Sequence, residues 1–278
     1  MPAEQVARNL AFVNWTLLAS LAVGSFGAVA FLRLRTDATT GYLGFTALCA
    51  AAFGGLAWLS DGALPAAAAA GSPVTVDPAW DVPRRLALGL LAGGALAYGF
   101  VLFRGRRAAP LAIGAAAAGV ATMLFGALTW GGGPVGIGAL GVQLLALAAA
   151  TGGIFAAMIL GHWYLVTPKL STGPALVLSR LLLGVVAVQL VLFVAWVGLG
   201  IGTSNAPLAP LTGPWALFVW LRLVVSLVFP LVLCWAAVQT VRTRSMESAT
   251  GLLYINVALI AAGTIDAAGL YFGAGLLV

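Results

Sequence analysis

Eight long apolar segments fill most of this 278-residue chain and constrain its fold more than any other feature. The hydrocarbon core of a bilayer is about 30 Å thick, so a helix that rises about 1.5 Å per residue needs about 20 apolar residues to cross it. The sequence therefore predicts an all-α fold, a polytopic bundle of eight transmembrane helices. The predicted spans are Leu10–Leu32, Tyr42–Leu59, Leu86–Phe103, Pro110–Trp130, Ile137–Leu160, Ala175–Ile201, Trp215–Val241 and Ala249–Phe272.

The composition supports a membrane protein and limits its function. Hydrophobic residues make up 62% of the chain and charged residues 7%. Because the spans use nearly all the residues, we expect one transmembrane domain, residues 1–278, with an outer loop at residues 61–85 and no soluble catalytic domain. The sequence has no nucleotide-binding loop, metalloprotease motif or nucleophile elbow. Any enzymatic role is therefore expected to be that of a subunit in a larger oxidoreductase complex.

The basic residues predict the orientation of the spans. Most of them follow odd-numbered predicted spans, namely Arg33, Arg35, Arg104, Arg106, Arg107, Lys169, Arg242 and Arg244. Positively charged connections stay in the cytoplasm, so both termini are predicted to lie outside the cell membrane. The protein is expected in the inner (cytoplasmic) membrane of a bacterium. This orientation accounts for the net charge of +6, and we expect no nucleic-acid partner.

Arg222 and Asp266 are opposite charges inside two successive apolar segments. A charge at membrane depth is expensive, so it normally faces a partner, a cavity or a substrate path. If the two segments are antiparallel, each charge lies roughly 10 Å of helix from the same membrane face. Arg222 could instead be interfacial, because Leu223–Val241 alone is long enough to span. Asp266 must be protonated or paired, so the pair is the first candidate for the functional site.

Three of the amides within the predicted spans are further candidates for this site. Asn14 and Gln143 fall near the outer ends of the first and fifth spans, and Gln189 lies deeper in the sixth. In hydrocarbon each amide must find a hydrogen-bond partner. They either tie helices together or line a polar pocket with Arg222 and Asp266, and both interpretations remain open.

His162 is the only histidine, and it follows the fifth span at the predicted inner face, where Arg180 could approach it. One histidine excludes a bis-histidine haem and a histidine-rich copper or zinc site within this chain. A single haem on His162 is disfavoured. His162 is instead interpreted as an interfacial residue, as part of an inner site for a quinone head group, or as part of a proton relay.

The C-terminal third carries a family resemblance. Leu221-Arg222-Leu223 lies early in the seventh span, and Gly263-Thr264-Ile265-Asp266 lies in the eighth. These residues and the eight-span topology resemble the membrane anchor subunits of molybdopterin oxidoreductases, of the DMSO reductase and polysulfide reductase (NrfD-like) type. Such anchors often carry an arginine in the seventh span and a Gly-Glu-Leu-type step in the eighth. Here Thr264 follows Gly263 and the carboxylate comes two residues later. The segments Gly161–Leu165 and Ser248–Tyr254 lie outside this pattern and are similar to uncharacterised bacterial membrane proteins.

The resemblance implies a quinone-interacting subunit of a respiratory complex. Asn14, Gln143, Arg222 and Asp266 would line an outer quinone pocket, and electrons would pass between quinol and an iron–sulfur partner subunit. Arg222 would bind a quinone carbonyl or hold Asp266 ionised, and Asp266 would relay a proton. Two alternatives remain: a small-solute transporter or channel in which Arg222 recognises an anion, and a structural or assembly subunit in which Arg222 and Asp266 clamp two helices together.

Overall fold

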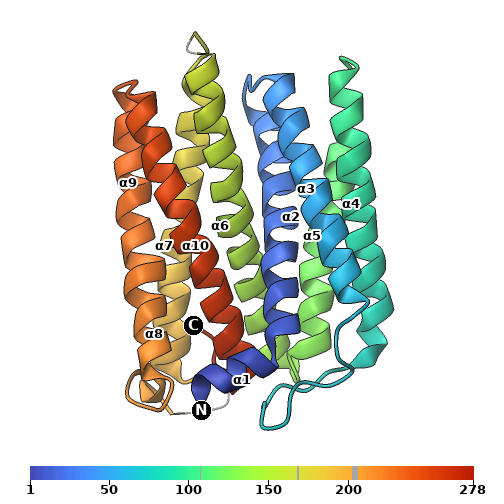
Figure 1. Ribbon diagram of the computed structural model, residues 1–278, viewed down its shortest axis with the longest axis vertical. Coiled ribbons are helices and arrows are strands. Elements are labelled where there is room, and N and C mark those ends of the chain that lie inside the picture. Colours follow the sequence, from blue (N-terminus) through green and yellow to red (C-terminus); the bar gives the residue numbers. More distant parts are fainter. Residues whose placement is uncertain (107, 168, 202–205) are drawn as a thin grey trace.

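The computed structural model describes residues 1–106, 108–167, 169–201 and 206–278. Within these residues, eight helices are long and apolar enough to cross a membrane, so the chain is an all-helical, multi-pass membrane protein, as predicted (Figure 1). The α-helices are α1 Pro2–Arg8, α2 Leu10–Arg35, α3 Thr40–Asp61, α4 Asp81–Phe103, α5 Ala109–Trp130, α6 Pro134–Val166, α7 Gly173–Leu199, α8 Ala216–Leu223, α9 Phe229–Arg242 and α10 Met246–Ala274. Short 3-10 turns at Pro78–Trp80 (η1) and Ala209–Leu211 (η2), and a π-helical turn at Val224–Val228 (η3), complete the described elements.

The helices form two groups that stand side by side, α2–α5 and α6–α10 (Figure 1). Glycines let the backbones of α2 and α6 touch where the groups meet. A Cβ atom on Gly24 would collide with the carbonyl oxygen of Ala148, and one on Gly152 would collide with the backbone of Gly24. The Ser25 hydroxyl donates a hydrogen bond of 3.2 Å to the Gly152 carbonyl. Small residues commonly allow this close helix approach in membranes.

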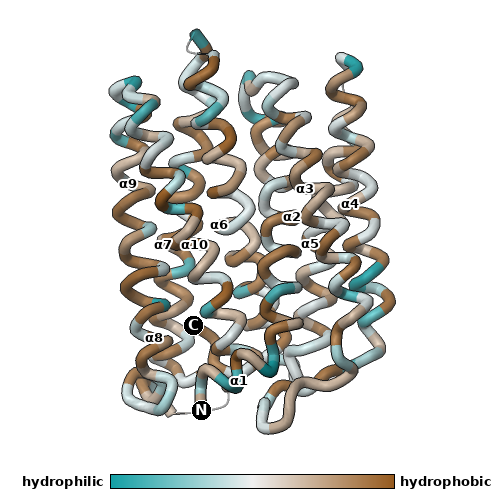
Figure 2. Tube along the Cα trace, in the orientation of Figure 1, coloured by the Kyte–Doolittle hydropathy of each residue, from teal (hydrophilic) through white to brown (hydrophobic). Residues whose placement is uncertain are grey.

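Polar residues gather at the two ends of the bundle, and hydrophobic residues dominate between them (Figure 2). One end holds α1, the connection between α3 and α4, and both termini (Figure 1). We call it the N-terminal end. The other end carries the basic connections between the odd and even spans, and we call it the arginine-rich end. Its described basic residues are Arg33, Arg35, Arg104, Arg106, Lys169, Arg180, Arg242 and Arg244.

The predicted outer loop is shorter than residues 61–85. Asp61 ends α3 and Asp81 begins α4, so Arg84 lies in the first turn of a helix. The connection of residues 62–80 packs onto both helix groups: Asp77 N donates to the Thr129 carbonyl at 2.8 Å, and the Ser72 hydroxyl donates to the Phe272 carbonyl at 2.6 Å. These bonds fasten the connection across the N-terminal end.

The seventh span is interrupted just before Pro230, where the sequence predicts a kink. Proline has no N–H, so the carbonyl four residues earlier, that of Ser226, loses its normal α-helical donor. The structure has the π-helical turn η3 at this place, between α8 and α9. Such turns are rare and frequently occur at functional sites. Here the turn places Ser226 one helical turn after Arg222, facing α10.

Candidate functional site

The structure brings the two predicted membrane charges into one region. Arg222 projects from α8 and is buried, while Asp266 projects from α10 and is half-buried. Arg222 is the seventh residue of α8 and Asp266 lies eight residues before the end of α10. At about 1.5 Å per residue, both side chains start roughly 10 Å of helix from the N-terminal end. The predicted equal depth of the two charges therefore agrees with the fold.

Gly263 makes room for the guanidinium of Arg222. A Cβ atom on Gly263 would lie 2.7 Å from Nη1 of Arg222 and 2.5 Å from Cβ of Ser226. The guanidinium and the Ser226 side chain therefore lie directly against the backbone of α10. Asp266 is three residues further along the same helix, which places it on the same side of α10 as Gly263.

Arg222 and Asp266 nevertheless do not form an ion pair within 4.0 Å in the described part of the chain. Nε of Arg222 and Oδ2 of Asp266 are both buried and have no hydrogen-bond partner among the described residues. Buried polar groups are normally hydrogen bonded, because an unmade bond in low dielectric costs free energy. One of these atoms is a hydrogen-bond donor and the other an acceptor, so the region is suited to a ligand that offers both an acceptor and a donor.

A further row of polar side chains on α10 continues from this site into the bundle. The hydroxyls of Thr151 and Thr264 share a hydrogen bond of 2.6 Å. Deeper, the amide nitrogen of Asn256 donates to Cys234 Sγ at 3.1 Å and lies 3.4 Å from the Pro230 carbonyl. These contacts hold α10 to α6 and α9, so the backbone beneath the site is fixed.

The site lies beside the surface that faces lipid. Ile265 is exposed next to Asp266, and Trp220 and Leu221 are exposed next to Arg222. Ile265 and Leu221 are apolar, and Trp220 donates from its Nε1 to the Leu211 carbonyl at 3.2 Å. Asp266 itself is half-buried, so it keeps some contact with the outside of the bundle.

The other predicted outer residues do not join Arg222 and Asp266. Gln143 is buried, and both ends of its amide are used: its nitrogen donates to an oxygen of Val278 and its oxygen accepts from Trp196 Nε1 at 3.2 Å. It ties α6 to α7 and to the C-terminal residues, which agrees with the structural interpretation. Asn14 is exposed on α2, in the other helix group.

The inner residues His162 and Arg180 are both exposed at the arginine-rich end. No hydrogen bond connects them in the described structure. Gln189, which the sequence placed mid-span, is buried with its amide nitrogen unpartnered. In the described residues no three His, Cys, Asp or Glu side chains come together as a metal site would require.

Sequence reasoning missed a second buried arginine. Arg84, assigned to a loop, is buried at the N-terminal end, where its Nε lies 2.8 Å from Asp61 and its Nη1 lies 2.8 Å from Asp81. Nη1 also donates to the Thr129 hydroxyl at 2.9 Å, and the guanidinium lies over the Trp130 ring at 4.8 Å. The i, i+3 spacing of Asp81 and Arg84 at the start of an apolar run was the available signal.

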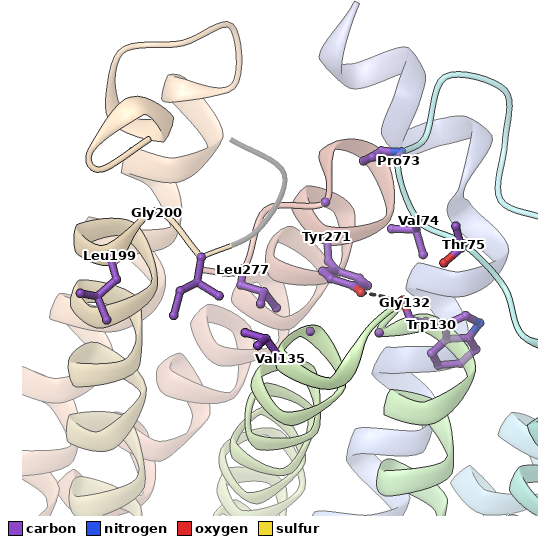
Figure 3. A pocket seen from close by; sticks show the side chains of 14 residues that line it. Pro73, Val74, Thr75, Trp130, Gly132, Val135, Leu199, Gly200, Tyr271 and Leu277 are labelled. Atoms are coloured by element: carbon purple, nitrogen blue, oxygen red, sulfur yellow. Dashed lines mark hydrogen bonds between the residues drawn. The ribbon is translucent and has the colours of Figure 1, made fainter. Parts of the chain in front are cut away.

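A pocket of about 420 Å³ opens at the N-terminal end (Figure 3). Backbone and apolar side chains line it, among them Trp130, Val135 and Leu277. The Tyr271 hydroxyl points across it and donates to the Trp130 carbonyl at 2.8 Å. Among the residues that the structure describes, its lining carries no charged side chain and includes none of the predicted site residues.

Comparison with known proteins adds no assignment. No protein-family model, curated protein or solved structure matches this chain. The resemblance to the reductase membrane anchors therefore stays a prediction, and the functional argument depends on the geometry of the Arg222–Asp266 site.

Proposed function

We propose that this protein is a quinone-interacting membrane subunit of a respiratory redox complex, with its quinone site at Arg222 and Asp266. One observation carries the proposal: a buried donor, Arg222 Nε, and a buried acceptor, Asp266 Oδ2, lack partners beside a lipid-facing surface. A quinone is dissolved in the membrane and presents carbonyl oxygens, and the quinol presents hydroxyl groups. Both forms suit this donor and acceptor.

The two side chains would have separate roles. Arg222 donates a hydrogen bond to a carbonyl oxygen of the quinone and positions the ring. Asp266 accepts a hydrogen bond from a hydroxyl of the quinol and takes its proton when the quinol is oxidised. Oxidation of a quinol releases two protons and two electrons. Asp266 would take the protons one after the other, passing the first to water before it takes the second, and the electrons require an acceptor in a partner subunit, such as an iron–sulfur protein. In this arrangement the chain contributes binding and proton transfer.

The surroundings favour a membrane-soluble ligand over a solute from water. The rim beside the site is apolar, with Trp220, Leu221 and Ile265 exposed. An anion reaching Arg222 from water would have to pass this rim or the packed helix ends. By the positive-inside rule the arginine-rich end lies in the cytoplasm of a bacterium. The site then lies in the outer half of the inner membrane, and protons taken by Asp266 would leave outward.

The proposal is tested on the full chain purified in a mild detergent. Lipid extraction with mass spectrometry measures quinone that is retained, and quenching of tryptophan fluorescence by added decylubiquinone measures binding. The variants Arg222→Met and Asp266→Asn remove one unpartnered atom each. Thr151→Val is the matched control, because it removes a buried polar group near the site but neither of those atoms.

We expect saturable binding by the unaltered protein and by Thr151→Val. Arg222→Met and Asp266→Asn should weaken it at least about tenfold, which corresponds to the loss of one charge-assisted hydrogen bond of about 1.5 kcal/mol or more. If the unaltered protein retains no quinone and shows no saturable quenching, or if both variants bind as it does, the quinone proposal is wrong.

A further inference from the structure

A second cavity lies at membrane depth between the two helix groups, with a volume of about 260 Å³. Residues of α2, α5, α6 and α7 line it, and all of them are apolar. Gly27, Ala149 and Gly153 are among the small residues that keep it open. None of its lining residues belongs to the Arg222–Asp266 site, so it is a separate feature of the fold. We call it the intergroup groove.

The groove is elongated along the helices. On α2 its lining runs from Val23 to Phe31, and on α7 from Leu178 to Val185. At about 1.5 Å per residue these stretches are each roughly 10–12 Å long. Leu178 lies five residues after the start of α7, and Phe31 lies four residues before the end of α2. The groove therefore begins just below the arginine-rich end and runs parallel to the helices toward mid-span.

The groove opens sideways to the surroundings of the bundle. Val120 on α5 and Leu181 on α7 line it and are 43% and 40% exposed. At this depth the surroundings are hydrocarbon. An empty apolar groove would forfeit dispersion contacts on all its walls, so a hydrocarbon chain filling it is favourable. A narrow slot aligned with the helices fits an extended chain of the adjoining leaflet.

A positive charge lies beyond the end of the groove that is nearer the arginine-rich end. Arg35 follows Phe31 by four residues, which places it one turn further along the same face of α2. It is exposed and forms no ion pair or hydrogen bond with any residue the structure describes. The arginine-rich end around it has a strong excess of basic over acidic residues. Such an end attracts anionic lipid head groups.

We propose that the intergroup groove binds one anionic phospholipid, with an acyl chain in the groove and the phosphate on Arg35. The apolar lining accounts for the chain, and Arg35 accounts for the charge of the head group. A helix of a second copy does not fit, because a helix about 10 Å across and as long as the groove has several times its volume. A prenyl tail does not explain the position of Arg35.

The proposal is tested by measuring phospholipids that stay with the purified full chain, using native mass spectrometry and lipid analysis. Gly27→Leu fills the groove, since a Cβ atom at Gly27 meets no other atom within 4 Å. Gly93→Leu is its matched control, because Gly93 on α4 is equally free of neighbours but lies outside the groove. Arg35→Gln removes the charge, and Arg180→Gln removes an exposed arginine from the same end.

We expect the unaltered protein, Gly93→Leu and Arg180→Gln to retain phospholipid enriched in the anionic class. Gly27→Leu should lose most of it, and Arg35→Gln should lose the enrichment for anionic species. The proposal is wrong if Gly27→Leu retains as much phospholipid as the unaltered protein. It is also wrong if Gly27→Leu loses a quinone instead of a phospholipid. The third contrary result is that the unaltered protein is a dimer and that, among the variants, only Gly27→Leu is a monomer. None of these four variants changes Arg222 or Asp266. The lipid proposal can therefore fail while the quinone proposal holds, and the reverse is also true.

Discussion

Arg84 and Arg222 are each 2% exposed, but the two helix groups surround them very differently. In the α2–α5 group, Arg84 reaches two carboxylates, a hydroxyl and an aromatic face. In the α6–α10 group, Arg222 lies against a glycine and a serine, and its Nε has no partner. An arginine whose three guanidinium nitrogens are all hydrogen bonded, as in Arg84, holds a structure together. One with a donor left over is available to a ligand, and this difference separates a structural arginine from a candidate binding residue.

The largest effect on the free energy of unfolding is expected when Arg84 is removed. Arg84→Ala leaves the Asp61 carboxylate buried without its partner, which typically costs about 3–5 kcal/mol. Denaturant unfolding of the purified protein, followed by tryptophan fluorescence, would report the change. Arg85→Ala is the control, because Arg85 packs over the Trp58 ring at 4.5 Å and its loss should cost only about 0.5–1 kcal/mol. If both variants lose the same small amount, Arg84 does not hold the group together.

An intermediate effect on the free energy of unfolding is expected when a methyl group is added at Gly263, against which the Arg222 guanidinium packs. Gly263→Ala places a Cβ atom 2.5 Å from Cβ of Ser226 and 2.7 Å from Nη1 of Arg222, so these groups must move. Overpacking of this kind costs about 1–3 kcal/mol. Decylubiquinone binding should fall in parallel, because the guanidinium is displaced.

The same substitution at an open position is the control for Gly263→Ala. Gly93→Ala adds its methyl group where no atom lies within 4 Å, so quinone binding should stay unchanged and stability should not fall. Normal quinone binding by Gly263→Ala, measured by fluorescence quenching, would show that the position of the guanidinium does not matter for the ligand.

The smallest effect on stability is expected for the arginine with the unpartnered atom. Arg222→Met breaks no hydrogen bond or ion pair with the described residues, so we expect a change below about 1 kcal/mol, of the order measured for polar contacts between membrane helices. The same unfolding experiment tests this. A loss as large as that of Arg84→Ala would mean that Arg222 clamps α8 to α10, and the distinction between the two arginines would disappear.

The eight spans could be predicted from the sequence because a bilayer sets one length scale for every helix. All eight predicted segments are helical in the structure, with ends that differ by a few residues. The largest difference is at α6, which continues past Leu160 to Val166 and carries His162 beyond the predicted end. Pro230 predicts a kink in the seventh span, and just before it the structure contains the π-helical turn η3, which the sequence did not predict.

The partners of individual polar side chains could be predicted only in part. Arg222 and Asp266 stood out because they are charges in apolar runs, and hydropathy alone locates such residues. Arg84 did not, because it follows a loop and its burial depends on Asp61 from another helix. Gln143 was predicted to need a hydrogen-bond partner, but its bond to Val278 depends on how the residues around Val278 pack against α6, which no local pattern encodes.

The contact between Gly24 and Gly152 limits how the two helix groups can move. With no side chains between them at these glycines, the backbones of α2 and α6 pack directly against each other. Shifting α2 by one residue would put Val23 or Ser25 in the place of Gly24, and a Cβ atom there would collide with the Ala148 carbonyl. The contact therefore opposes translation of one group along the other. If the proposed quinone site opens or closes, we expect the motion near the π-helical turn η3, which already breaks the regular helix.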